Sequence, residues 1–238
     1  MRADTRHELK HDRFAVATAD TLSWAAEHRA KITTALVVLA VLLVAGIGGW
    51  VFLQRRNQAA SADLGDALRT LHAELREAGA AARPNVPSFT SVEERAKEAQ
   101  DKFRAVRDKY SWTAAADVAE YYLGLTAYDL GNTAEAEQAL KKVADGRNRD
   151  LAALGKYALA NIYRASGKQK EAIDILQQLI DKPANSVPKV TAQLELASVY
   201  EGSRPADAVR LYEQIKTENP KGGPAVEQAN ARLATVKR

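Results

Sequence analysis

Residues that could carry out catalysis or bind a metal are few in this sequence. His7 and His11 lie one helical turn apart, a spacing that can hold a metal ion, but only Glu8 and Asp12 accompany them in a polar segment. The chain has no cysteine, which excludes disulfides, thiolate metal sites and a cysteine nucleophile. We therefore expect these histidines to be solvated, and we predict neither a cofactor nor a metal site.

Motifs of the common enzyme classes are also absent. The sequence has no HExxH zinc motif and no phosphate-binding loop, and His72 is the one histidine outside the N-terminal 31 residues. Lysine and arginine number 34 against 30 acidic residues, and they are spread along the chain without a basic block, which argues against nucleic-acid binding. The sequence predicts a protein that is not an enzyme and has no nucleic-acid partner.

The side chains best suited to chemistry are ones that recognise other proteins. They recur at helical spacing in three successive segments, as Tyr121, Leu125 and Tyr128, then Tyr157, Asn161 and Arg164, then Leu194, Ser198 and Glu201. Tyrosine offers a rigid apolar ring with a polar tip, and Asn and Arg can bind a backbone or a carboxylate. We expect these residues to line a protein-binding groove for an extended apolar segment. The alternative is that several of the tyrosines pack between structural units.

An internal repeat positions these side chains. Ala136, Ala172 and Ala208 are spaced by 36 residues, and a leucine followed by Gly or Ala precedes each of them. Small residues let two helix backbones approach closely. Gly131 and Gly167 fall where the first helix of a unit must end, since glycine adopts the left-handed conformation readily. Each repeat is therefore predicted to be a pair of helices joined by a short turn.

Local signals mark where helices begin. Ser91 followed by Glu94, and Asn132 followed by Glu135, both resemble a capping box. Pro205 suits the first turn of a helix, where its missing N–H is not needed. These signals predict helix starts after residues 91 and 132 and at residue 205.

A continuous apolar segment covers residues 32–53. Its 22 residues carry no charge. As a helix they would extend about 33 Å, against a hydrocarbon core of about 30 Å. Arg29, Lys31, Arg55 and Arg56 flank the segment. The length and the flanking charges predict a transmembrane helix.

Other interpretations of this segment stay open. It could be the buried helix of a soluble protein, or a signal peptide cleaved near Ala60-Ser61-Ala62, although the length of the apolar run and Arg55 beside it argue against cleavage. Three basic residues lie near each end, so the positive-inside rule does not decide the orientation. Ala45 and Gly49 form a small-xxx-small pair that would suit a homo-oligomer in the membrane.

The repeat resembles a known family of helical repeats. Tetratricopeptide repeats are similar to the segments YLGLTAYDLGNTAEAEQAL, LANIYRASGKQKEAIDIL and ELASVYEGSRPADAVRLYEQIKTENP, which match the Leu-Gly/Ala, Tyr, Gly, Ala and Pro positions of the motif. The tryptophan that the motif places in the first helix is absent, and Glu120, Lys156 and Gln193 stand there. The resemblance implies a right-handed solenoid of helix pairs.

Together these features predict an all-α chain, with a single N-terminal transmembrane helix followed by an α-solenoid of tetratricopeptide-like helix pairs. The expected parts are a partly helical tail at 1–31, the transmembrane helix at 32–53 and a repeat domain at 57–238. Within the domain we expect a degenerate first unit at 58–110, with a helix at 58–79 and a loop at 80–91, then units near 113–146, 149–183 and 187–220, and a cap helix at 224–238.

The order of tail, membrane span and repeats resembles the bacterial ancillary SecYEG translocon subunit family, whose repeat domain is shared with the periplasmic cell-division coordinator family. The resemblance implies a single-pass inner-membrane protein with its N terminus in the cytoplasm and its repeats in the periplasm. It implies protein partners among translocon subunits, periplasmic chaperones and client polypeptides. The alternatives are a structural scaffold for envelope assembly or cell division, and a cytoplasmic adaptor held at the membrane.

Overall fold

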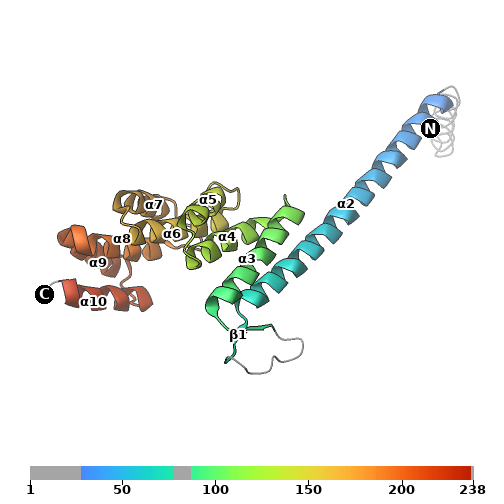
Figure 1. Ribbon diagram of the computed structural model, residues 1–238. Helices are drawn as coiled ribbons and strands as arrows, with labels where there is room; N and C mark the ends of the chain where they lie inside the picture. The colour runs from blue at the N-terminus through green and yellow to red at the C-terminus, as the bar shows by residue number, and fades with distance from the viewer. Residues whose placement is uncertain (1–27, 78–86, 237–238) are drawn as a thin grey trace, which may run out of the picture. The chain divides into compact units, whose positions relative to one another are not determined.

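The computed structural model describes residues 28–77 and 87–236 of the chain. The expected tail at 1–31 therefore lies outside the described residues apart from its last four positions. Most of the described chain is helical. The helices are α2 (Arg29–Leu71), α3 (Val92–Lys109), α4 (Ala114–Asp129), α5 (Thr133–Ala144), α6 (Arg149–Ala165), α7 (Gln169–Asp181), α8 (Lys189–Ser203), α9 (Pro205–Glu218) and α10 (Pro224–Val236), as Figure 1 shows.

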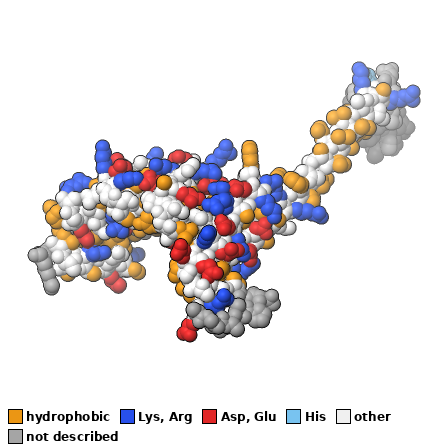
Figure 2. Space-filling view, viewed as in Figure 1, with side chains coloured by type: hydrophobic (Ala, Val, Ile, Leu, Met, Phe, Trp, Pro, Cys, Tyr) orange, Lys and Arg blue, Asp and Glu red, His pale blue; other side chains and the backbone are white. Residues whose placement is uncertain are grey.

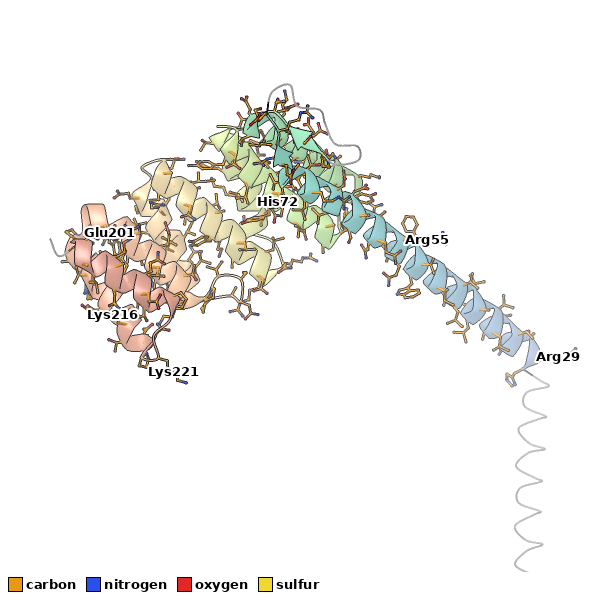
Figure 3. All side chains as sticks on the ribbon, turned by 90° about the horizontal axis from the view of Figure 1, so that it is seen from below. Arg29, Arg55, His72, Glu201, Lys216 and Lys221 are labelled. Carbon is orange, nitrogen blue, oxygen red and sulfur yellow. The ribbon has the colours of Figure 1, made fainter. Side chains whose placement is uncertain are left out.

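The chain divides into two compact units, residues 1–55 and 56–238, and α2 contributes to both. In the first unit α2 is apolar, and its large side chains from Leu36 to Leu53 are exposed around the whole helix. Figure 3 labels Arg29 and Arg55 near the two ends of this part. Among the described residues, α2 is the one helix long and apolar enough to cross a membrane, judged by length and composition.

The second unit is a stack of antiparallel helices in chain order. From α3 onward each helix packs mainly against the next one along the chain (Figure 1). The repeated alanines Ala136, Ala172 and Ala208 are fully buried, as expected for positions where helices approach most closely. A Cβ on Gly124 would lie 2.5 Å from Leu140 Cγ, so this contact between α4 and α5 requires glycine. The solenoid of helix pairs is confirmed, and its core is a chain of small clusters between neighbouring helices.

The helix ends follow the sequence signals with one exception. Gly131 and Gly167 have φ angles of 81° and 75° at the turns inside their repeats. Ser91 caps α3, since its hydroxyl accepts a hydrogen bond from the Glu94 backbone N–H at 3.0 Å. Asn132 precedes α5 but its side chain makes no capping hydrogen bond. The predicted capping box is therefore wrong there. The Asn132 backbone N–H that Glu135 would bind donates to the Ala127 carbonyl at 2.8 Å instead, and the Glu135 carboxylate lies 2.9 Å from Arg104 of α3.

The degenerate first repeat departs most from the expectation. Helix α2 ends at Leu71 rather than near residue 79, and β1 (Glu74–Leu75) pairs in parallel with β2 (Ser88–Phe89). The Arg76 backbone N–H donates to the Phe89 carbonyl at 2.8 Å, which continues this pairing. The guanidinium of Arg95 in α3 binds the Ala73 carbonyl at 2.9 Å. These bonds turn the chain toward the start of α3, so the expected uninterrupted helix and strand-free loop were wrong.

The part of α2 after residue 55 belongs to the helical stack. Its buried Ala60 and Ala67 join Phe103 of α3 in one apolar cluster. Polar bonds flank the cluster, since Lys102 Nζ lies 2.6 Å from Asp66 Oδ2. This segment takes the place of the first helix of the degenerate repeat.

Candidate functional site

The predicted groove residues lie on the first helix of each repeat. We call them the first-helix surface, and they are Tyr121, Leu125 and Tyr128 of α4, Tyr157, Asn161 and Arg164 of α6, and Leu194 and Ser198 of α8. None of these eight side chains is fully buried. Tyr128 is 37% exposed and Arg164 is also exposed, whereas the other six are half-buried. The surface is therefore within reach of a partner, and its use as a binding site stays a prediction.

The half-buried members also contribute to the fold. Tyr121 and Leu125 pack against the cluster formed by α4 to α7, and Tyr157 packs against the cluster formed by α6 to α8. The Tyr121 and Tyr122 rings meet edge to face with centroids 5.3 Å apart. The packing between repeats that the sequence left as an alternative is therefore present for Tyr121 and Tyr157, and each residue also keeps an accessible part. The protein-binding groove stays a prediction.

A polar cluster joins α6 to α8 on this surface. Arg164 Nε lies 2.8 Å from Glu195 Oε1, but the two groups are not aligned as a hydrogen bond, and this buried oxygen has no hydrogen-bond donor. Burial raises the pKa of the Tyr157 phenol, the nearby Glu195 carboxylate raises it further, and a hydrogen bond from Asn161 opposes the rise. The cluster presents the Tyr157 phenol, the Asn161 amide and the exposed Arg164 guanidinium, which are groups that can bind a peptide backbone or a carboxylate.

The contribution of Glu195 was missed by the sequence reasoning. It follows the predicted Leu194 directly, so helical spacing gave no reason to place it beside Arg164.

Glu201, predicted to point into the groove, instead makes contacts within the fold. Its carboxylate accepts a hydrogen bond from the Tyr212 hydroxyl at 2.8 Å and lies 3.6 Å from Arg232 of α10. Figure 3 labels Glu201 on α8, in the same part of the stack as α10.

Polar side chains occupy the positions where the repeat motif has tryptophan. Each bridges the first helix of its repeat to the second helix of the same repeat. The bridges are Glu120 to Lys142 at 2.8 Å, Lys156 to Gln178 at 3.2 Å and Gln193 to Glu218 at 3.0 Å. These pairs fasten the two helices of each repeat to one another in place of an indole packed between them.

A cavity of about 520 Å³ lies on a different part of the second unit. Its lining residues come from the end of α3, the α3–α4 turn, α4, α5, the α5–α6 turn and the start of α6. They are Arg107, Asp108, Ser111, Trp112, Ala116, Asp117, Glu120, Lys142, Val143, Gly146, Arg147, Asn148 and Leu151. None of these belongs to the first-helix surface. Sequence periodicity could not find this cavity, because turns and two separate repeats build it.

The described residues 28–77 and 87–236 hold no group of three or more histidine, aspartate or glutamate side chains placed to bind a metal ion. His7 and His11 lie outside them.

Comparison with known proteins places this geometry in a family. Residues 23–185, more than half of the chain, match the family described as "Tetratricopeptide repeat-like domain". The chain belongs to the tetratricopeptide repeat-like domain family. The matched range includes the apolar part of α2 as well as the helices from α3 to α7.

Solved structures show the same tetratricopeptide-like fold at low sequence identity. A single-residue variant of a putative kinesin light chain with nearly identical TPR-like repeats, from Podosopora anserina, has a TM-score of 0.55 and 19% identity, covering 74% of this chain and 84% of its own. A second structure of that protein, without the substitution, has a TM-score of 0.54 and 18% identity over the same shares. No curated protein matches the sequence. Tetratricopeptide-like folds are typically non-enzymatic scaffolds that bind other proteins, so the partners implied for this chain are proteins.

Proposed function

We propose that this protein is a membrane-anchored adaptor that binds polypeptide partners along the first-helix surface. The observation that carries the proposal is the row of accessible tyrosine, asparagine and arginine side chains on α4, α6 and α8. A flexible partner could align its backbone with the Tyr157, Asn161 and Arg164 groups while its apolar side chains meet the tyrosine rings. The first-helix surface extends over three helices and is not a single pocket. Such a surface suits an extended polypeptide segment better than a small molecule.

The apolar part of α2 supports the anchoring. No described part of the chain covers it, and its most apolar window is not buried at all. A helix that is apolar all round is buried either in a protein core or in a bilayer. Arg29, Lys31, Arg55 and Arg56 at its ends suit the two lipid–water interfaces. Such a tether would raise the effective concentration of the first-helix surface near membrane partners.

The resemblance to the ancillary translocon subunit family supports a location and a set of partners. The protein would be a single-pass protein of the bacterial inner membrane, with its N terminus in the cytoplasm and its repeats in the periplasm. Its partners would be translocon subunits, periplasmic chaperones or client polypeptides. A chain without cysteine is compatible with the oxidising periplasm.

Site-specific photo-crosslinking tests the surface. A photoreactive amino acid is placed at Tyr128 or Asn161 on the first-helix surface, and at Asp174, an exposed position of α7, as the matched control. We expect crosslinks to translocon subunits, chaperones or nascent chains from the first two positions and not from the third. Equal labelling from Asp174 would contradict the surface. A single stoichiometric envelope protein as the only product would favour the scaffold for envelope assembly or division.

Cysteine labelling tests the topology, and the absence of native cysteine makes it direct. Ser203→Cys and Thr5→Cys variants are treated in intact cells with a membrane-impermeant maleimide, and lysed cells serve as the control. We expect Ser203→Cys to react in intact cells and Thr5→Cys to react only after lysis. The reverse pattern would replace the periplasmic adaptor with a cytoplasmic adaptor held at the membrane.

A further inference from the structure

We propose that Trp112 is a second membrane contact, an indole that inserts into the interfacial layer of the bilayer and holds the α3–α4 turn against it. The inference rests on the membrane anchoring proposed above. It concerns a different residue and a different surface from the partner-binding row.

Trp112 combines two unusual properties. Its side chain is 100% exposed, although tryptophan is among the largest apolar residues. Its backbone φ angle is 78°, in the left-handed region that bulky residues rarely adopt. Glycine would satisfy this turn without steric cost, so neither packing nor backbone conformation accounts for tryptophan here.

The turn that carries Trp112 is fastened to the start of the second unit. Arg56 Nη2 donates to the Lys109 carbonyl at 3.1 Å and lies 3.5 Å from the Ser111 carbonyl. The Tyr110 hydroxyl donates to Asp63 Oδ2 at 2.7 Å. These bonds keep residues 109–111, directly before Trp112, beside the first residues of α2 within this unit.

Chain connectivity places the same residues near the end of the apolar segment. Three peptide bonds separate Leu53, its last residue, from Arg56, so their Cα atoms can be at most about 11 Å apart. If the segment spans a bilayer, Arg56 lies at or near the lipid–water interface, and the turn bound to it lies in the same layer. Tryptophan is enriched in that layer because its ring is apolar while its N–H is polar.

The surrounding charges favour a lipid surface. Arg55, labelled in Figure 3, is exposed beside the apolar segment. Lys109 next to the turn keeps a largely exposed side chain, although its Nζ lies 3.0 Å from Asp63 Oδ2. Basic groups close to a bilayer are attracted to anionic headgroups. The cavity that Trp112 also borders holds both acidic and basic side chains, among them Lys142 paired with Glu120 at 2.8 Å, so it does not favour a ligand of one charge.

Tryptophan fluorescence of the full-length protein tests the proposal. The sequence has three tryptophans, so a Trp24→Phe, Trp50→Phe variant leaves Trp112 as the only one. The protein is reconstituted into vesicles of phosphatidylethanolamine and phosphatidylglycerol, with or without lipids brominated near the headgroup. We expect a blue-shifted emission and roughly twofold quenching by the shallow bromine, as for an interfacial indole.

The matched control carries an exposed tryptophan in another turn. Ser166→Trp, in a background with Phe at 24, 50 and 112, places the probe at the exposed end of α6. Its emission should remain that of an indole in water and should not respond to brominated lipid. Quenching of both probes to the same extent would overturn the proposal, because it would indicate general adhesion of the repeats to the vesicle.

A third variant separates this inference from the anchoring on which it rests. Trp24→Phe with Trp112→Phe leaves Trp50, which lies inside the apolar segment. Quenching of Trp50 without quenching of Trp112 would overturn the second contact and leave the anchor intact, whereas loss of both signals would overturn the anchor as well. Shielding of Trp112 only when other membrane proteins are co-reconstituted would assign the residue to a protein interface instead and would also overturn the proposal.

Discussion

The two parts of α2 have opposite surroundings although they belong to one helix. From residue 33 to residue 55 every described side chain is exposed, including leucines and valines that are more than half exposed. From Arg56 to Leu71 the helix carries three fully or almost fully buried side chains, Ala60, Ala67 and Thr70. Large apolar residues of the first part thus have no partner within the described protein, whereas Leu64, Leu68 and Leu71 of the second part pack against the cluster around Ala60 and Ala67.

This difference in exposure indicates which interaction stabilises each part of α2. Small residues are favoured where helix backbones meet, and each buried alanine of the second part leaves room for a neighbour such as Phe103. Large apolar side chains exposed around a helix gain nothing from the described protein, which is why we proposed above that a bilayer covers them. Figure 2 shows hydrophobic side chains along this first part and a mixture of charged and other side chains over the repeats. Five experiments test this difference between the apolar part of α2 and the packed second unit.

The largest effect is expected from a charge in the packed part of α2. Ala67→Glu places a carboxylate and extra volume in a fully buried site beside Phe103, which should lower the free energy of unfolding by roughly 4 kcal/mol. A urea titration of the protein in detergent, followed by circular dichroism, measures it. Ala62→Glu, at an exposed site of the same helix, should change stability by less than about 0.5 kcal/mol. Equal effects would mean that this part is not packed as described.

A charge in the apolar part should act on the membrane and not on the repeats. Leu43→Arg is expected to oppose bilayer insertion by about 3 kcal/mol. The measurement is the fraction of protein that resists alkaline carbonate extraction, with Leu43→Ile as the control that keeps the segment apolar. The urea midpoint of the repeats should stay unchanged. A variant that remains fully membrane-bound would contradict the transmembrane interpretation.

Adding a single methyl group should lower the free energy of unfolding only in the packed second unit. In Gly155→Ala the new Cβ would lie 2.9 Å from Val143 Cγ1 and 3.2 Å from the Leu140 carbonyl oxygen, so we expect a loss of about 1–3 kcal/mol. Gly48→Ala, in the apolar part of α2, has open space around it and serves as the control. The comparison uses thermal melts of both variants in the same detergent. A neutral Gly155→Ala would show that α5 and α6 are less closely packed than described.

Acid should weaken the repeats while leaving the uncharged segment at 32–53 unaffected. Hydrogen bonds from Gln214, Gln193 and Lys189 lower the pKa of Glu218 from 4.5 to about 2. The stabilisation by this carboxylate is therefore complete above pH 4.5 and is lost as the pH falls toward 2. We expect Glu218→Gln to flatten the dependence of Tm on pH in this window. An unchanged slope would mean that the bridge between α8 and α9 contributes nothing measurable.

The smallest effect is expected at the α3–α4 turn. Trp112→Gly should raise the free energy of unfolding by about 0.5–1 kcal/mol, because glycine adopts a positive φ without the cost of a Cβ. Trp112→Ala keeps that cost and should give no gain. Urea titration of both variants in detergent measures the difference. A stabilising Trp112→Gly would indicate that the tryptophan serves the surface at the expense of the fold. A destabilising one would mean that the indole packs in solution.

Much of the fold could be predicted because its determinants are local. The alanines spaced by 36 residues, Gly131 and Gly167 in their turns, and Pro205 at the start of α9 all lie where the periodicity indicated. The capping box at Asn132 failed for the opposite reason. Glu135 Oε1 lies 2.9 Å from Arg104 of α3, and this contact 31 residues away competes with the local one.

For the candidate site, the sequence could predict which residues are accessible but not which other residues they contact. Helical spacing selected eight side chains that are all at least partly accessible, but it could not show that Tyr121 and Tyr157 also pack between repeats. It assigned Glu201 to the groove, whereas the hydroxyl of Tyr212 occupies its carboxylate. The partners of a charged side chain depend on which helix lies opposite, and a single helix does not contain that information.

By itself the sequence determined that the chain is helical, repeats about every 36 residues and contains one uncharged apolar segment of 22 residues, because each of these depends on residue type and spacing along one stretch of chain. Tertiary structure decided where α2 stops being free and becomes packed, which polar groups bridge each helix pair, and that Trp112 stands exposed on a turn held by Arg56. Those features join residues that are more than 20 positions apart, and their energies exist only once the helices have stacked.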